Sequence, residues 1–326
     1  MAVFHTQDIS GKHFLVTGGA GFIGSHIVEY LLAYGAGKVS VLDNLSTGSQ
    51  RNVDLFSGNS HYEFIKGDIR DAKTCEMACQ GIDHVSHQAA LGSVPRSVKD
   101  PITSNEVNIS GFVNMITAAK DAKVKSFVYA SSSSVYGDEP KLPKTEPVAG
   151  NLLSPYAVTK KTNELYAAVF GDLYGMKIAG LRYFNVFGPR QDPEGPYAAV
   201  IPLFVKGIMD RSPVYINGDG EQTRDFTFVE NAVQANVRAM LSINDEAFGQ
   251  VYNVAVGANF SVNFLYNEIS SLLSIDHPPV HRAARQGDIR DSLADISKAR
   301  RLLSYEPTTH FLDGLKKTVD FFRQSH

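Results

Sequence analysis

The amino-acid sequence predicts an α/β fold: a doubly wound parallel sheet with helices on both faces, and a smaller lobe of mixed α/β topology. Two observations predict the sheet. Short apolar runs alternate with longer amphipathic segments through the first half, and the first apolar run leads through a glycine-rich turn into a helical pattern. The lobe is predicted because from Phe184 onward the pattern loosens into shorter segments punctuated by proline and glycine. We therefore expect two domains, residues 1–181 and 182–326, with some segments of the second returning to the first.

The elements of the first half follow in a regular order. The expected strands are all short apolar runs, at residues 14–16, 38–42, 62–66, 84–88, 126–131 and 177–183. The expected helices share an apolar spacing of three or four residues, and lie at residues 72–79, 104–122, 155–174 and, in the second half, 311–322. Parallel sheets bind ligands beyond the carboxyl ends of their strands, so the loops after these strands are the first candidates for a functional site.

The glycine-rich turn at Thr17–Gly24 has the spacing G-x-x-G-x-x-G and precedes a helix whose apolar residues recur at helical spacing. Gly18 suits a sharp exit from the strand, Gly21 lets backbone N–H groups approach a pyrophosphate, and Gly24 lets the helix pack closely on the strand. The positive end of that helix would attract the anion. The turn therefore indicates a dinucleotide site, with a plain structural turn as the alternative.

A carboxylate at the end of the second strand favours the dinucleotide interpretation. Asp43 follows Gly24 by nineteen residues, where such a group hydrogen-bonds the adenosine ribose. Asp43 would repel a 2′-phosphate, and the next residue is Asn44 rather than arginine, so the predicted cofactor is NAD rather than NADP. Asp68 and Ile69, after the third strand, are expected to contact the adenine.

Composition and charge argue against several classes of function. The 326 residues are 43% hydrophobic and 20% charged, and the net charge of −3 gives no general attraction to nucleic acid or anionic lipid. The sequence shows no apolar stretch of about 18 residues and no signal-peptide pattern, so we expect a cytoplasmic protein with no membrane partner. Cys75 and Cys79 are the only cysteines and have no second ligand pair, so we expect buried thiols and no metal site.

Tyr156 and Lys160 lie four residues apart and share one face of the expected helix 155–174. A nearby ammonium favours a phenolate, so we expect Lys160 to lower the pKa of Tyr156 and to prepare it as a general base. The fifth strand runs into a serine cluster that contains Ser132, twenty-four residues before Tyr156. An exposed helix pair is the alternative, but the glycine turn and the serine-rich strand end favour catalysis.

With these motifs the chain resembles the extended short-chain dehydrogenases/reductases, a family with a Rossmann-like sheet, and among them the nucleotide-sugar C4 epimerases. The matching motifs stand in the family's order along nearly the whole chain: Thr17–Gly24, Asp43, Asp68, residues 87–90, Asn108, Ser132, Tyr156, Lys160 and residues 182–190. The resemblance implies that Ser132 hydrogen-bonds the reacting sugar hydroxyl, Tyr156 abstracts its proton, and Lys160 holds the nicotinamide ribose. We place the NAD contacts at Gly18, Gly21, Phe22, Ile23, Gly24, Asp43, Asn44, Asp68, Ile69, Gln88, Ala89, Ala90, Tyr156, Lys160 and Tyr183.

The resemblance also separates the branches of that family. Nucleotide-sugar dehydratases carry an acidic pair where this chain has Ser133 and Ser134, and the decarboxylase branch carries a glutamate just before the position of Val135. Serines do not readily supply the acid–base chemistry that dehydration needs. The expected reaction is therefore C4 epimerisation, in which hydride is removed from the sugar and returned through a 4-keto intermediate.

The second half resembles the family's UDP-sugar site. Asn185 is expected to donate to the diphosphate, and Arg224 and Arg285 match phosphate-binding arginines, whose planar guanidinium groups bind phosphate oxygens in pairs. Members restricted to glucose and galactose carry a bulky residue at the position of Ser292, so this small side chain implies room for an N-acetyl group. We place the substrate contacts at Gly92, Ser93, Ser132, Ser133, Asn185, Ala199, Val200, Tyr215, Asn217, Arg224, Arg285, Asp288 and Ser292.

These observations predict an isomerase that converts UDP-N-acetylglucosamine to UDP-N-acetylgalactosamine, with UDP-glucose to UDP-galactose as a second conversion and polysaccharide precursor synthesis as the setting. A UDP-glucuronate or UDP-N-acetylhexosaminuronate 4-epimerase is the alternative. So is a non-catalytic NAD-sensing protein, which the intact Ser132, Tyr156 and Lys160 disfavour. Relatives pair through the helices corresponding to residues 104–122 and 155–174, so a homodimer is expected.

Overall fold

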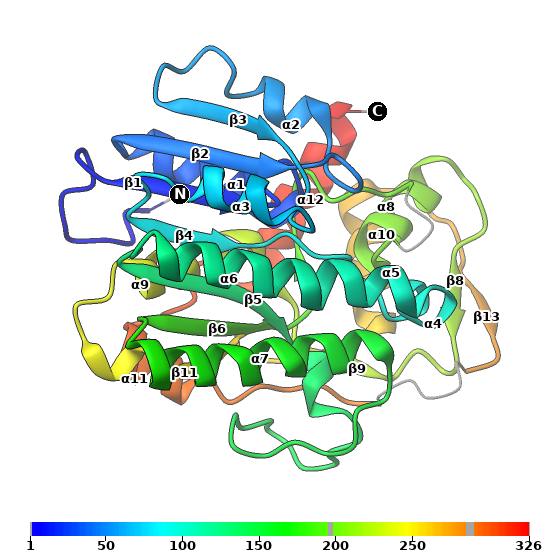
Figure 1. The fold of residues 1–326 in the computed structure, drawn as a ribbon. Coiled ribbons are helices and arrows are strands. Elements are labelled where there is room, and N and C mark those ends of the chain that lie inside the picture. Colours follow the sequence, from blue (N-terminus) through cyan, green and yellow to red (C-terminus); the bar gives the residue numbers. More distant parts are fainter. Residues whose placement is uncertain (1, 195–197, 285–289, 326) are drawn as a thin grey trace.

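A seven-stranded sheet forms the centre of the protein (Figure 1). The structure, a computed structural model, describes residues 2–194, 198–284 and 290–325. In spatial order the strands are β3 (Tyr62–Lys66), β2 (Lys38–Asp43), β1 (His13–Thr17), β4 (His84–His87), β5 (Ser126–Ser132), β6 (Ile178–Tyr183) and β11 (Gln250–Val254). Each strand is parallel to its neighbours, and the order reverses between β1 and β4. This doubly wound order confirms the predicted fold class.

Helices cover both faces of the sheet because its side chains alternate between the two faces. Val16 of β1 packs into the cluster that contains α1 (Phe22–Ala33) and α9 (Val229–Met240). Its neighbour Leu15 packs into the opposite cluster, which contains residues of α3 (Ala72–Ala78), α6 (Gly111–Asp121) and α7 (Pro155–Tyr174). A sheet buried on both faces reads as continuous apolar runs, which is why its strands were predictable.

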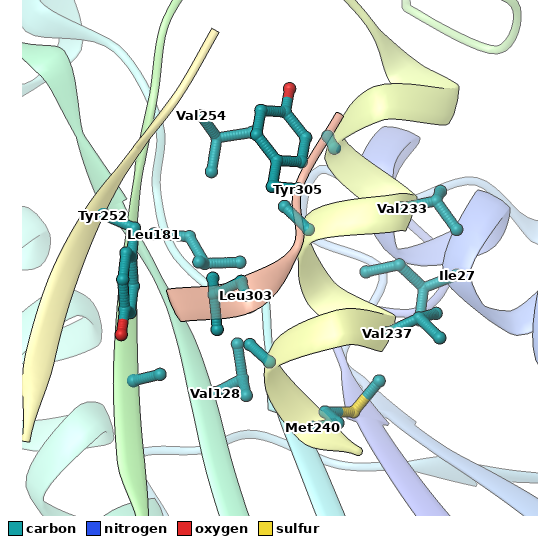
Figure 2. Packing of buried hydrophobic residues seen from close by; sticks show 14 of the residues in the cluster. Ile27, Val128, Leu181, Val233, Val237, Met240, Tyr252, Val254, Leu303 and Tyr305 are labelled. Carbon is teal, nitrogen blue, oxygen red and sulfur yellow. The ribbon is translucent and has the colours of Figure 1, made fainter. Parts of the chain in front are cut away.

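The core on the α9 face joins segments that are far apart in the sequence. Figure 2 shows Val233 and Val237 of α9 beside Ile27 of α1, on the side of α9 that faces away from β11. On the other side, α9 meets the sheet through Val128 and Leu181. The same cluster takes in Tyr252 and Val254 of β11, Leu303 of α11 (Ser297–Leu303) and Tyr305. Helix α9 is therefore a central element of the core rather than a surface helix.

Residues 229–254 thus supply a covering helix and an edge strand to the main sheet. β6, which pairs with β11, spans Ile178–Tyr183, so the expected domain boundary after residue 181 falls within a strand. The division into two domains stays a prediction.

A second core lies beside the sheet and holds the smaller elements. It is formed by α8 (Val200–Met209), α10 (Val262–Leu273) and α12 (Phe311–Ser325), and Phe187 and Phe226 pack against Phe311 within it. Three two-stranded sheets flank these helices. They are β7 (Val186–Phe187) with β10 (Thr227–Phe228), β8 (Tyr215–Asn217) with β13 (Val280–Arg282), and β9 (Thr223–Arg224) with β12 (Phe260–Ser261). Only the last pair of these three is antiparallel, which gives the mixed topology that was predicted.

The helix expected at residues 104–122 is longer and less regular than predicted. It begins as α5 (Pro101–Asn105), passes through a π-helical turn at Glu106–Ser110, and continues as α6. Single π-turns inside helices occur frequently at functional sites. The remaining short helices are α2 (Gln50–Asp54), α4 (Val94–Lys99) and the 3₁₀ turns Ser133–Tyr136 and Asp245–Ala247.

The two cysteines have the environment that was predicted. Cys75 and Cys79 are buried and unpaired, and burial raises the pKa of each thiol to about 12. Within the described ranges, no cluster of His, Cys, Asp and Glu side chains could hold a metal ion. None of the helices described is long and apolar enough to cross a membrane.

Candidate active site

The glycine turn is as tight as its sequence indicates. Gly18 adopts a positive φ of 69°, and a Cβ there would lie 2.7 Å from the backbone N of Ala89. A Cβ on Gly24 would lie 2.2 Å from the carbonyl oxygen of Gly18, so helix and strand approach as closely as their backbones allow. Gly21 is the N-cap of α1 and provides no side-chain cap, which leaves the first turn of this twelve-residue helix open to an anion.

A cavity of about 440 Å³ opens between this turn and the ends of β1, β2, β4, β5 and β6. The residues that line it include every position at which we placed an NAD contact: Gly18, Gly21, Phe22, Ile23, Gly24, Asp43, Asn44, Asp68, Ile69, Gln88, Ala89, Ala90, Tyr156, Lys160 and Tyr183. Because a Cβ on Gly18 or Gly24 would fill the backbone space at its edge, the cavity fits a pyrophosphate approached by main-chain N–H groups.

The carboxylate of Asp43 is held in place by its own backbone surroundings. Its Oδ2 accepts a hydrogen bond from Ala20 N at 3.0 Å, and its Oδ1 accepts one from Leu45 N at 2.8 Å. Burial raises the pKa of this carboxyl, while these two hydrogen bonds act to lower it. Each oxygen keeps a further lone pair, so Asp43 retains acceptor capacity for ribose hydroxyls.

A second acidic group lies at the expected adenine end of the cavity. Asn44 Nδ2 donates to Asp68 Oδ2 at 2.9 Å, and Arg70 binds the same carboxylate through Nε and Nη2. Hydrogen bonds from Arg70 lower the pKa of Asp68 to about 2, so this carboxylate stays ionised. Arg70 was missed in the sequence because a charged residue in a loop carries no signal of its own.

Ser132, Tyr156 and Lys160 all line the other end of the cavity. Lys160 Nζ donates to the carbonyl oxygen of Ala130 at 2.8 Å and lies 5.9 Å from the centre of the Tyr156 ring. Ser132 ends β5, and its Oγ accepts from Ser134 N at 3.2 Å. The structure therefore brings together the three residues that the sequence separates by up to twenty-eight positions.

The protonation of this group differs from the expectation. Burial raises the pKa of the Tyr156 phenol, whereas we expected Lys160 to lower it; the hydrogen bond with Ser132 acts in the lowering direction. Burial lowers the pKa of Lys160 to about 8. The physical reason for both shifts is that burial disfavours the charged form of either group. Lys160 nevertheless remains mostly a cation at neutral pH and can stabilise a negative charge that develops on Tyr156.

Two networks of buried side-chain hydrogen bonds, which the sequence did not reveal, hold residues next to the cavity. Gln88 Oε1 accepts from Tyr183 Oη at 3.0 Å, and its Nε2 donates to Asn236 Oδ1 at 3.0 Å. Asn236 Nδ2 in turn donates to Tyr183 Oη at 2.7 Å. No signal marked Asn236, because its partners lie more than fifty residues away along the chain.

The second network holds the end of β5. Arg182 is 1% exposed and forms a two-point ion pair with Glu164 of α7, with both N···O distances at 2.8 Å. Ser131 Oγ donates to Glu164 Oε1 at 2.7 Å. Burial acts to raise the pKa of Glu164, but the Arg182 guanidinium outweighs it and lowers the pKa. The signal that could have found this pair is an arginine in the apolar run of residues 178–183, since a buried charge needs a partner.

The predicted substrate residues divide into three groups. Gly92, Ser132 and Asn185 line the cavity. Ser93, Ser133, Ala199, Val200, Tyr215, Asn217, Arg224 and Ser292 do not; Ser93 is the N-cap of α4. Of these, Ser292 N donates to Thr223 O at 3.1 Å, which places Ser292 beside Arg224 on β9. Arg285 and Asp288 lie outside the described residues.

The chain is similar to known proteins along most of its length. The family model described as "NAD dependent epimerase/dehydratase family" matches residues 14–255. The chain is 39% identical to a UDP-glucose 4-epimerase of Mycolicibacterium smegmatis, with 95% of this chain and 98% of the relative covered.

Two solved structures share the fold at high similarity. A UDP-N-acetylglucosamine 4-epimerase from Methanobrevibacter ruminantium, solved with UDP-N-acetylmuramic acid, has a TM-score of 0.92 and 40% identity, and 97% of this chain and 100% of that chain are covered. A UDP-glucuronic acid 4-epimerase from Bacillus cereus, solved with UDP-glucuronic acid and NAD, has a TM-score of 0.88 and 32% identity, with 96% and 100% covered.

Proposed function

The chain belongs to the NAD dependent epimerase/dehydratase family, and from that premise we propose that it epimerises UDP-sugars at C4, with UDP-N-acetylhexosamines as its preferred substrates. The observation that carries the reaction is the shared cavity: the glycine turn, Ser132, Tyr156 and Lys160 all line it. Its relatives named as UDP-sugar 4-epimerases support the same reaction. The N-acetyl preference rests on the resemblance at Ser292, a small side chain where members restricted to glucose and galactose carry a bulky one.

The residues of the cavity divide the chemistry between them. NAD, when bound, supplies the acceptor and later the donor of the C4 hydride. Ser132 orients the C4 hydroxyl, and Tyr156 Oη, in its phenolate form, takes the hydroxyl proton as C4 becomes a ketone. Lys160 stabilises the charge on Tyr156. After the sugar has rotated to present its other face, Tyr156 returns the proton to the ketone oxygen. The same side chain therefore acts as the base in the first half-reaction and as the acid in the second.

A substrate panel tests the proposal. The purified protein is incubated separately with UDP-N-acetylglucosamine, UDP-glucose and UDP-glucuronate, and the C4 epimers are quantified by chromatography or NMR. We expect the largest kcat/KM for UDP-N-acetylglucosamine and measurable turnover of UDP-glucose. Faster turnover of UDP-glucuronate would replace this proposal with the uronate 4-epimerase. No turnover of any sugar by protein that binds NAD would indicate a sensing role.

Two variants control the panel. Tyr156→Phe removes the general base, and we expect it to lower kcat at least about 100-fold, the usual contribution of such a group. Tyr166→Phe makes the same change at an exposed site of the same helix, where the side chain is 39% exposed, and should leave kcat unchanged. Near-normal turnover by Tyr156→Phe would show that the base is misassigned.

A further inference from the structure

The first turn of α7 carries Tyr156, and its backbone N–H groups need acceptors from outside the helix. Pro155 has no N–H, Ala157 N donates to the N-cap Ser154 Oγ at 3.1 Å, and Val158 N donates to Ser154 O at 3.1 Å. The N–H of Tyr156 itself donates to Ser97 Oγ, a residue of α4, at 3.0 Å. The acceptor for the Tyr156 N–H therefore comes from a different helix, fifty-nine residues earlier in the chain.

The hydroxyl of Ser97 is fully committed in this arrangement. Ser97 is 0% exposed, and its Oγ–H donates to Val94 O in the same helix at 2.8 Å. Since a hydroxyl has one proton to give, the oxygen can serve Tyr156 N only as an acceptor. Ser97 does not line the cavity, so it has no route to the cofactor or the sugar except through the backbone of Tyr156.

The backbone carbonyl of Tyr156 is also connected by hydrogen bonds to the segment that contains Ser97. Thr159 Oγ1 donates to Tyr156 O at 2.8 Å and accepts from Asn108 Nδ2 at 3.2 Å. Asn108, in the π-turn, also binds the N and O atoms of Leu91, at 2.7 and 3.1 Å, and Leu91 lines the cavity. The backbone of Tyr156 is thus linked on both sides to residues 91–97, which begin at the cavity wall.

We propose that Ser97 is a positioning residue, which fixes the first turn of α7 so that the phenol of Tyr156 meets Ser132 and the reacting hydroxyl. This inference rests on the proposed function. The phenolic oxygen sits at the end of a long side chain, so a small rotation of the helix turn moves it farther than the backbone. A misplacement of about 1 Å can lower a catalytic rate by about 100-fold.

Three variants separate this role from ordinary packing. Ser97→Ala removes the acceptor, and Ser97→Cys keeps the shape of the side chain but replaces the oxygen by a larger sulfur, which is a weak acceptor. Ser104→Ala is the matched control: Ser104 is 1% exposed on α5, and its Oγ donates to Asp100 O at 2.8 Å, but it has no bond to α7 among those described. Each variant is assayed for kcat and KM with UDP-N-acetylglucosamine, for NAD affinity by calorimetry, and for folding by thermal melting.

We expect both Ser97 variants to lower kcat by about 10- to 100-fold while the KM and the NAD dissociation constant change less than about threefold. Ser104→Ala should keep the kcat of the unaltered protein even where its melting temperature falls. Unchanged kcat in Ser97→Cys, or an equal loss of kcat in Ser104→Ala, would overturn the proposal. If Ser97→Ala does not fold, the kcat of Ser97→Cys alone tests the proposal.

Tyr156→Phe in the same assay separates the positioning role of Ser97 from the proposed function. If Tyr156→Phe stays active, the proposed function is wrong. If Tyr156→Phe is inactive but the Ser97 variants stay active, the positioning role is wrong.

Discussion

The imidazole of His87 lies at the end of β4 and is buried, with 4% of the residue exposed. Its Nδ1 lies 2.8 Å from Thr17 Oγ1, and its ring packs against Phe112 and Phe127 at centroid distances of 5.5 and 5.8 Å. Burial lowers the pKa of His87 to about 3, so the ring is neutral at physiological pH. The free energy of unfolding therefore depends on pH through the protonation of His87.

The sign of that dependence follows from the two protonation states. The unfolded chain binds a proton at His87 near pH 6.5, whereas the folded protein binds it only near pH 3. The contribution of the neutral His87 to the free energy of unfolding is therefore fully present above pH 6.5, and it is lost as the pH falls toward 3. Protonation of this one group should lower the free energy of unfolding by about 3 kcal/mol between pH 7 and pH 4.

In urea unfolding at the two pH values, we expect the free energy of unfolding of His87→Gln to fall by about 3 kcal/mol less than that of the unaltered protein. His61→Gln, at an exposed histidine, should match the unaltered protein; an unchanged slope in His87→Gln would contradict the assignment.

The tight connection from β1 to α1 depends on glycines, because a side chain at these positions would overlap the backbone. The carbonyl of Gly18 accepts from Gly21 N at 3.0 Å, and the same carbonyl is the atom that a Cβ on Gly24 would strike. Strand, turn and helix therefore share one narrow contact. The backbone N–H groups can face a ligand there only because no Cβ stands between them.

Gly24→Ala should consequently disturb both stability and cofactor binding. Relieving the overlap requires α1 to move away from the turn, and overpacking of this kind costs about 1–3 kcal/mol. We expect a lower unfolding free energy and at least about tenfold weaker NAD binding by calorimetry. Gly58→Ala is the control, since a Cβ there would meet no atom within 4 Å. Equal NAD affinity in the two variants would show that the close approach at Gly24 is not needed.

The elements that were predictable from the sequence are those with local causes. The strands at residues 62–66 and 126–131 and the helix at 155–174 agree with β3, β5 and α7 to within a residue, because apolar periodicity, proline and glycine act over a few positions. The π-turn was not predictable, since one extra residue in a turn leaves the apolar spacing almost unchanged. Asn236 and the Arg182–Glu164 pair were missed because their partners are distant in the sequence and only the fold brings them together.

At the scale of the whole molecule, one helix face is apolar and exposed. Along α7 the outward residues Val158, Leu165, Val169 and Leu173 are 46, 59, 50 and 70% exposed. Their spacing of seven, four and four residues places them in one stripe. Contiguous exposed apolar surface of this kind marks interaction sites. We propose that a second copy of the chain covers this stripe in a two-fold homodimer, in which each α7 packs on its counterpart.

A charge in the middle of the stripe tests the dimer. Leu165→Glu would place two carboxylates in an apolar interface, and we expect the protein to become a monomer at micromolar concentration in sedimentation or light-scattering measurements. Leu312→Glu alters a leucine of similar exposure, 48%, on α12 and should leave the assembly unchanged. If the protein without substitutions sediments as a monomer, the proposed α7–α7 interface does not exist.

The return of β11 to the edge of the main sheet has a consequence for synthesis of the chain. β6 is complete at Tyr183, but its partner β11 ends only at Val254, seventy-one residues later. At about 5–20 residues per second, a ribosome needs roughly 4–14 seconds to supply that partner, and β6 presents an unpaired edge in the meantime. During synthesis the first half of the chain therefore passes through an interval in which the edge of its sheet at β6 has no partner and is open to pairing with a neighbouring chain.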